Sequence, residues 1–70
     1  MFESKYEKQS IDRLTFIKQK NLAQMKNNNI KTLGQLSKQT KTDLRNLGFE
    51  NFEINKIDIE LQLLGLGLKS

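Results

Sequence analysis

The chain has no cysteine, no histidine and no proline, and each absence excludes a class of protein. Without cysteine, its 70 residues cannot be held by disulfides or by a thiolate metal site. Without histidine, it lacks the commonest general base and the commonest metal ligand. With no proline and only four glycines, it also lacks the turn residues typical of an all-β protein.

Groups suited to catalysis are also scarce. No serine has a base beside it in any recognisable motif, and nothing resembles a metal-binding loop. The acids of the second half fall at expected helix starts or on one solvated helix, where first-turn acids simply complement the helix dipole. These acids are Asp43, Glu50, Glu53, Asp58 and Glu60. We therefore expect a non-enzymatic binding domain with no cofactor and no metal.

Long hydrophobic runs are missing as well. No run approaches the roughly 18 residues needed to span a bilayer, and the N-terminus is too polar for a secretory signal. We expect a cytoplasmic protein with no membrane partner. Residues 1–9 carry one aromatic pair among polar groups and are predicted to be a linker or disordered lead-in, with the domain itself over residues 10–70.

The charge is divided unevenly along the chain. From residue 13 to residue 41 there are seven basic residues and no acid, whereas residues 46–70 hold two lysines and four acids, a net charge of −2. A chain divided in this way offers a polyanion one preferred side. A lysine-rich surface that only confers solubility would explain the same charges.

The hydrophobic pattern predicts a break before the first helix. One helix from Ile11 to Met25 would place Lys18 in the middle of an apolar stripe without a partner. We therefore expect a non-helical lead-in and then a helix over about residues 19–28. Thr32 and Thr40 are suited to cap two further short helices, the first to about residue 37 and the second ended at once by Asn46-Leu47-Gly48.

The last helix is expected over about residues 50–64, with Gly65 as its end and the following leucines folded back on the core. Ile54, Ile57, Leu61 and Leu64 lie on one face of it. Phe52, Ile59 and Leu63 form a second stripe on the opposite face, covered either by the lead-in or by a partner. The fold class is thus all-α: a compact bundle of about four short helices, similar to a helix-hairpin-helix.

Asn46-Leu47-Gly48 followed by a helix is a recognisable nucleic-acid-binding motif. Glycine lets the backbone approach a ligand closely. The unpaired amides and the dipole at the start of the next helix can then bind a phosphate.

The context of this tripeptide resembles a known family. The landmarks, in order, are Ile30-Lys-Thr-Leu-Gly-Gln-Leu-Ser-Lys-Gln-Thr40, then Asp43-Leu44, then Asn46-Leu47-Gly48, then Gly65-Leu66-Gly67-Leu68. Together they resemble the C-terminal domain of the bacterial RNA polymerase alpha subunit, over about residues 10–68. The resemblance implies a transcription module that binds the minor groove of A/T-rich upstream promoter DNA. It also implies contacts with sigma factor, other polymerase subunits and activators or repressors. The implied location is the cytoplasm, in association with the nucleoid.

The family reads DNA with an arginine at the start of its first helix and an asparagine three residues later. Matching that spacing gives Lys18 and Asn21, with two extra residues before Ile30; matching without a gap gives Lys20 and Ala23. Lysine in place of arginine predicts weaker recognition. The residues predicted to bind DNA are Lys18, Lys20, Asn21, Lys26, Asn46, Gly48 and Asn51.

Two departures from the family pattern bear on function. After the glycine the family has basic residues, but this chain has Phe49 and Glu50, and Glu50 would repel a phosphate. The segment that meets regulators in the family is less acidic here. It corresponds to Thr40, Lys41, Thr42 and Asp43. The alternative is therefore a protein-interaction domain on the same fold with little DNA binding.

Overall fold

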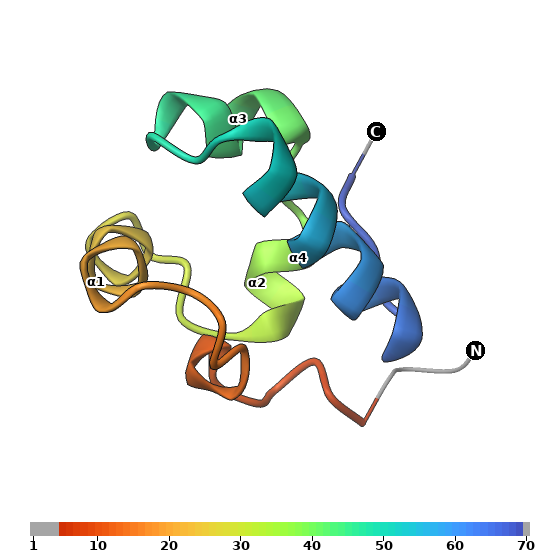
Figure 1. Ribbon diagram of the computed structural model, residues 1–70. Coiled ribbons are helices and arrows are strands. Elements are labelled where there is room, and N and C mark those ends of the chain that lie inside the picture. The colour runs from red at the N-terminus through yellow and green to blue at the C-terminus, as the bar shows by residue number, and fades with distance from the viewer. Residues whose placement is uncertain (1–4, 70) are drawn as a thin grey trace.

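The computed structural model describes residues 5–69, which form four helices after one short turn (Figure 1). The order is η1 (Ile11–Arg13), α1 (Gln19–Asn27), α2 (Leu33–Ser37), α3 (Lys41–Asn46) and α4 (Asn51–Leu63). The Cα radius of gyration is 11.0 Å, against about 11 Å for a compact chain of this length. The described residues contain no strand, so the all-α expectation is confirmed. None of their helices combines the length and hydrophobicity needed to cross a bilayer.

Local hydrogen bonds set where the short helices begin. Thr32 Oγ1 accepts from the Gln35 N–H at 3.2 Å, and Gln35 Oε1 accepts from the Thr32 N–H at 3.2 Å. The same reciprocal pair joins Thr40 and Asp43, at 3.1 and 3.0 Å. Helices of five or six residues are not stable alone, so these caps and the core must hold them.

The chain breaks at Lys18, as the hydrophobic pattern predicts. Lys18 is the N-cap of α1 with an extended backbone, φ −63° and ψ 146°. The break leaves the Lys18 side chain exposed while Ile17 and Leu22 on either side are buried. The lead-in is not wholly non-helical, however, because residues 11–13 form the 3₁₀ turn η1.

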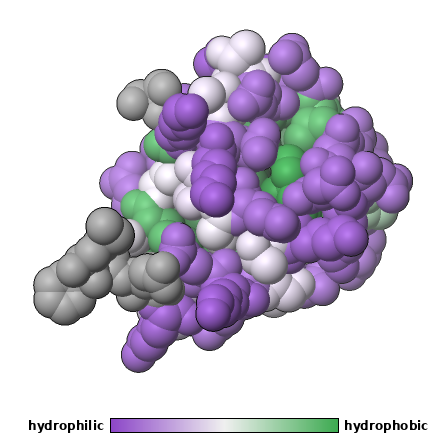
Figure 2. Space-filling model, turned by 180° about the vertical axis from the view of Figure 1, so that it is seen from behind, coloured by the Kyte–Doolittle hydropathy of each residue, from purple (hydrophilic) through white to green (hydrophobic). Residues whose placement is uncertain are grey.

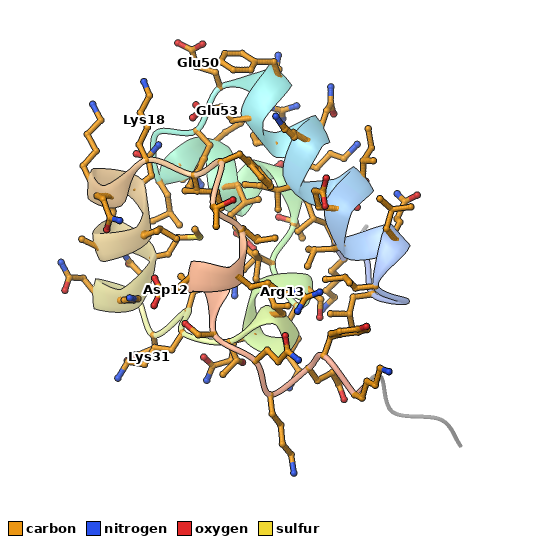
Figure 3. The ribbon with its side chains drawn as sticks, turned by 60° about the horizontal axis from the view of Figure 1, so that its bottom comes forward. Asp12, Arg13, Lys18, Lys31, Glu50 and Glu53 are labelled. Atoms are coloured by element: carbon orange, nitrogen blue, oxygen red, sulfur yellow. The ribbon has the colours of Figure 1, made fainter. Side chains whose placement is uncertain are left out.

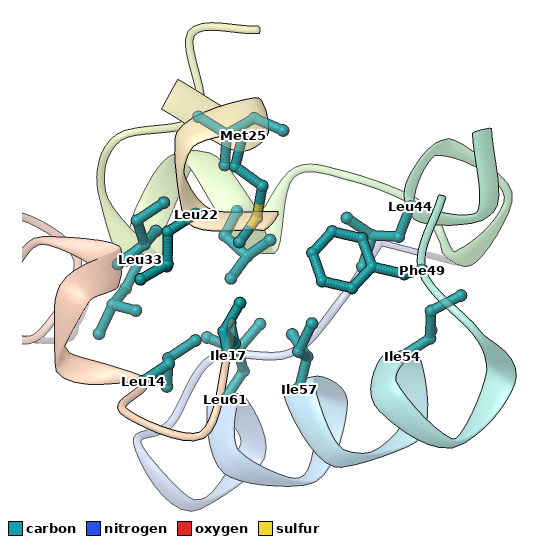
Figure 4. Packing of buried hydrophobic residues seen from close by; sticks show 13 residues of the cluster. Leu14, Ile17, Leu22, Met25, Leu33, Leu44, Phe49, Ile54, Ile57 and Leu61 are labelled. Carbon is teal, nitrogen blue, oxygen red and sulfur yellow. The ribbon is translucent and has the colours of Figure 1, made fainter. Parts of the chain in front are cut away.

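The core draws side chains from every segment of the bundle (Figure 4). Ile57 and Leu61 of α4 have no exposed surface and face residues of the lead-in and of α1 to α3. Phe49, which departs from the basic residue expected at its position, is 5% exposed and packs in this core. Its aromatic ring therefore contributes to folding, because burial of a phenylalanine side chain stabilises a small domain by about 1.5–3 kcal/mol.

The C-terminal tail folds back, as expected. Leu66 and Leu68 are half-buried and pack against the core. The Lys69 N–H donates to the Gln39 carbonyl at 3.0 Å, and the Leu68 N–H donates to Asp58 Oδ1 at 3.0 Å. The tail thereby ties α4 to the connection between α2 and α3.

The described start of the chain contacts α2. Residues 5–9 belong to the segment expected to be a linker or disordered lead-in, and two of their carbonyls hydrogen-bond to this helix. The N–H groups of Leu33 and Gly34 donate to the carbonyls of Gln9 and Glu7, each at 2.8 Å. The physical reason is that the first amides of α2 have no partner inside the helix. Residues 1–4, which belong to the same prediction, lie outside the described part of the chain.

Candidate nucleic-acid interface

Two segments predicted to bind DNA meet at one hollow of the surface. The hollow measures about 150 Å³ and lies between the start of α1 and the start of α4. Figure 3 shows Lys18, Glu50 and Glu53 on this side of the molecule. Its lining residues are Lys18, Lys20, Asn21, Gly48, Glu50, Phe52 and Glu53. The structure therefore places the Lys18 region and the glycine turn together, although they are far apart in the sequence.

Lys18 and Lys20 are both exposed at the N-terminal end of α1. A cation is unfavourable there, because the helix dipole places partial positive charge at that end. Neither lysine forms an ion pair within residues 5–69. Their positions thus contribute nothing evident to the stability of the fold, and their charges are available to an anion.

Gly48 completes the turn before α4 with a left-handed backbone, φ +99°. A Cβ atom built on Gly48 would meet no atom within 4 Å, so the backbone conformation and not crowding calls for glycine. The open side of Gly48 leaves room for an approaching ligand. The first amides of α4 follow at once and have no partner inside that helix.

The same hollow contains two carboxylates. Glu53 Oε1 accepts from the Glu50 N–H at 3.0 Å, and Glu53 Oε2 accepts from Asn21 Nδ2 at 3.4 Å. Asn21 is 9% exposed, so its amide faces Glu53 more than solvent. The sequence predicts the conflict with Glu50 but not the part played by Glu53. The position of Glu53 in the sequence could have indicated this part, because a glutamate three residues after the N-cap often accepts a hydrogen bond from the N-cap N–H.

Three of the predicted DNA-binding residues lie outside this hollow. Lys26, in the last turn of α1, forms an ion pair with Asp12 at 2.9 Å. Asn46 lines a different depression, on the side of Asn28 and Asp43. Asn51 Oδ1 accepts from Arg45 Nε at 2.9 Å. Arg45 is an exposed cation next to the glycine turn that the sequence reasoning missed, although it directly precedes Asn46-Leu47-Gly48.

The segment predicted to meet regulators is partly engaged in folding. The side chains of Thr40 and Asp43 cap α3. Lys41 Nζ lies 4.0 Å from Asp58 Oδ2, and Lys41 and Thr42 line a hollow of about 390 Å³ beside the C-terminal tail. Thr42 and Lys41 are exposed and thus remain accessible to a partner.

The second stripe of α4 is open to solvent. Phe52, Ile59 and Leu63 are 68%, 57% and 74% exposed, so the lead-in does not cover them. At its N-terminal end the stripe meets an apolar hollow of about 180 Å³, where Lys56 Nζ lies 4.9 Å from the centre of the Phe16 ring. Much of the surface seen from behind is hydrophilic, with small hydrophobic areas (Figure 2). The hollow between α1 and α4 and the apolar stripe thus adjoin at Phe52.

Comparisons with protein-family models, with curated proteins and with solved structures find no match to this chain. The likeness to the alpha-subunit domain therefore remains a resemblance that rests on the order of its sequence landmarks.

The chemistry of the hollow is electrostatic. Within residues 5–69, no group of three or more carboxylates is placed to hold a metal ion. Hydrogen bonds from Lys26 and Ser10 hold the pKa of Asp12 below its ordinary value, but Asp12 lies at the far end of α1 from the hollow (Figure 3). The hollow offers two lysine ammonium groups, an open glycine turn and a helix N-terminus to an anionic ligand, opposed by two glutamates.

Proposed function

We propose that this chain is a transcription module that binds duplex DNA through the hollow between α1 and α4. The observation that carries the proposal is the convergence of Lys18 and Lys20 with the Gly48 turn and the N-terminus of α4. Lys18 and Lys20 form no ion pair among residues 5–69. Exposed cations and a helix N-terminus are groups that hold phosphates in DNA-binding proteins.

The resemblance to the RNA polymerase alpha subunit supplies the setting of this proposal. In it, the module binds A/T-rich upstream promoter DNA, where the narrow minor groove concentrates negative potential that attracts lysine side chains. Sigma factor, other polymerase subunits and activators or repressors are its protein partners. Glu50 and Glu53 weaken the attraction, so stable binding depends on tethering to the rest of the polymerase.

Titration of the isotope-labelled domain with A/T-rich and G/C-rich duplexes tests the proposal. Amide shifts should concentrate in residues 18–21 and 46–53, and the A/T-rich duplex should bind more tightly. With two lysines on phosphates, log K should fall against log[salt] with a slope of about −2. Shifts confined to other residues would overturn the site.

A matched pair of double variants separates this site from general charge attraction. Lys18→Ala with Lys20→Ala removes the two cations of the hollow, and Lys31→Ala with Lys38→Ala removes two exposed cations elsewhere. The first pair should weaken binding about tenfold or more at low salt and flatten the salt slope. Equal losses from both pairs would show that only the net charge of the domain attracts DNA.

The second candidate function is a protein-interaction domain with little DNA binding. The exposed stripe on α4 favours it, because exposed hydrophobic side chains gathered on one face mark interaction sites. Under this hypothesis, Phe52→Ala should abolish partner binding while the Lys18 and Lys20 variants leave it unchanged.

A further inference from the structure

The outward face of α4 carries the largest exposed hydrophobic side chains of the described chain. Phe52, Ile59 and Leu63 recur at helical spacing and extend for about 16 Å along the helix. All three are more than half exposed. A face of this length on the longest helix needs an occupant that is itself elongated, such as a second helix.

Two opposite charges border the stripe on the same side. Lys56 and Glu60 are one turn apart on α4, and neither forms an ion pair within residues 5–69. Lys56 lies over the Phe16 ring, which leaves its ammonium group at the surface. An occupant of the stripe should therefore present an acid near Lys56 and a base near Glu60.

A second copy of α4 meets both requirements. Consider two antiparallel α4 helices related by a two-fold axis that passes between Ile57 and Asp58. Phe52 then lies opposite Leu63 of the second copy. Because the two-fold axis is perpendicular to the helices, the side of one α4 helix that carries Lys56 and Glu60 lies next to the same side of the other helix. Along the helix axis, Lys56 of each copy is then offset by only about 1.5 Å from Glu60 of the other copy.

We propose that two copies of this chain associate through the outward faces of their α4 helices, antiparallel, with reciprocal Lys56–Glu60 ion pairs. In this arrangement the charges that border the stripe on one copy complement those on the other. Three apolar side chains per copy bury less than the roughly 1,200 Å² of a stable complex, so the dimer forms only at high protein concentration. The proposal goes beyond DNA binding. Because Phe52 also lines the hollow, the association is measured without DNA.

Analytical ultracentrifugation of the full chain tests the association. Between about 10 µM and 1 mM, in the range of a weak complex, the average mass should rise from 8.2 kDa toward twice that value. Leu63→Lys should raise the dissociation constant at least tenfold, whereas Gln24→Lys, with the same charge change on the exposed side of α1, should not. A wild-type chain that stays monomeric at 1 mM overturns the proposal and leaves the stripe to a different protein.

Charge reversal identifies the occupant. Lys56→Glu alone and Glu60→Lys alone each place like charges opposite each other in the dimer, so each variant should be monomeric. An equimolar mixture of the two should associate again, because each chain then meets its opposite. Circular dichroism confirms that both variants fold, and Glu60→Lys leaves the Lys56 contact with Phe16 in place. A mixture no more associated than its components overturns the antiparallel arrangement.

Discussion

Asn21 and Glu53 are joined across the candidate interface by a hydrogen bond from Asn21 Nδ2 to Glu53 Oε2, 3.4 Å long. The other Glu53 oxygen accepts from the Glu50 N–H at 3.0 Å. One carboxylate thus engages both a side-chain amide of the hollow and a backbone amide at the start of α4. A phosphate that approaches these donors must compete with an anion already in place.

Glu53→Gln should therefore strengthen DNA binding. Glutamine keeps an oxygen for the Glu50 N–H and removes the negative charge. Loss of one like charge a few ångströms from a phosphate at the protein surface is worth on the order of 1 kcal/mol, or about three- to tenfold in affinity. Fluorescence anisotropy with an A/T-rich duplex measures the change.

Glu60→Gln is the matched control, because it removes the same charge from the same helix seven residues further along. It should change DNA affinity by less than about twofold, since it lies roughly 10 Å beyond Glu53 along α4 and is screened by salt. Equal gains from the two variants would mean that net charge, and not competition at the hollow, sets the affinity.

Much of the fold is predictable because its signals are local. The Thr32 and Thr40 caps, the break at Lys18 and the turn at Gly48 each depend on a few neighbouring residues. The helices accordingly lie within about two residues of the ranges expected from the sequence, a normal uncertainty for helix ends.

The interior of the site was less predictable, because it depends on tertiary contacts. Asn21 and Glu53 are 32 residues apart, and nothing in either segment indicates that they meet. The docking of residues 5–9 depends on backbone carbonyls, which leave no side-chain pattern in the sequence. Phe49 looked like a departure at the DNA site, but its ring belongs to the core.

The two faces of α4 should respond differently to truncation. Ile57 has no exposed surface, so Ile57→Ala should cost about 2–5 kcal/mol through lost burial and the cavity left behind. A domain of this size has about 4–10 kcal/mol of stability in total, so a large fraction could unfold near 37 °C. Leu63→Ala should change stability by about 0.5 kcal/mol or less. Urea denaturation at low protein concentration compares them, and a large loss from Leu63→Ala would instead place that side chain in the core.

Gly34→Ala probes the docking of the lead-in on α2. A Cβ atom at this position would lie 3.0 Å from the Glu7 carbonyl oxygen and 3.2 Å from Glu7 Cβ, so residues around Glu7 must shift. This crowding opposes the docking of the lead-in, whereas alanine favours the helix by about 0.5–1 kcal/mol. Because the two effects have opposite signs, the net change in the free energy of unfolding should be small. Amide resonances of residues 6–9 should shift and the position 34 amide should exchange faster with solvent. Lys38→Ala, at an exposed position after the same helix, should leave these signals unchanged.

Asp12→Asn should make the stability of the domain less dependent on pH. Hydrogen bonds from Lys26 and Ser10 lower the pKa of Asp12 from its ordinary value of 3.8. The folded state therefore favours the carboxylate. The resulting stabilisation is fully present above pH 3.8 and is lost as the pH falls through the lowered pKa.

The melting temperature of the variant should lie slightly below that of the wild type at neutral pH, because the exposed Asp12–Lys26 pair is screened by solvent. This difference in melting temperature should become smaller as the pH falls below 3.8, and it should also become smaller in high salt. Lys26→Gln should produce the same pattern, and the double variant should lose less than the sum of the two, because both single changes break one ion pair. A difference that stays constant down to pH 2 would mean that the Asp12 carboxylate has the same pKa in the folded and unfolded chain.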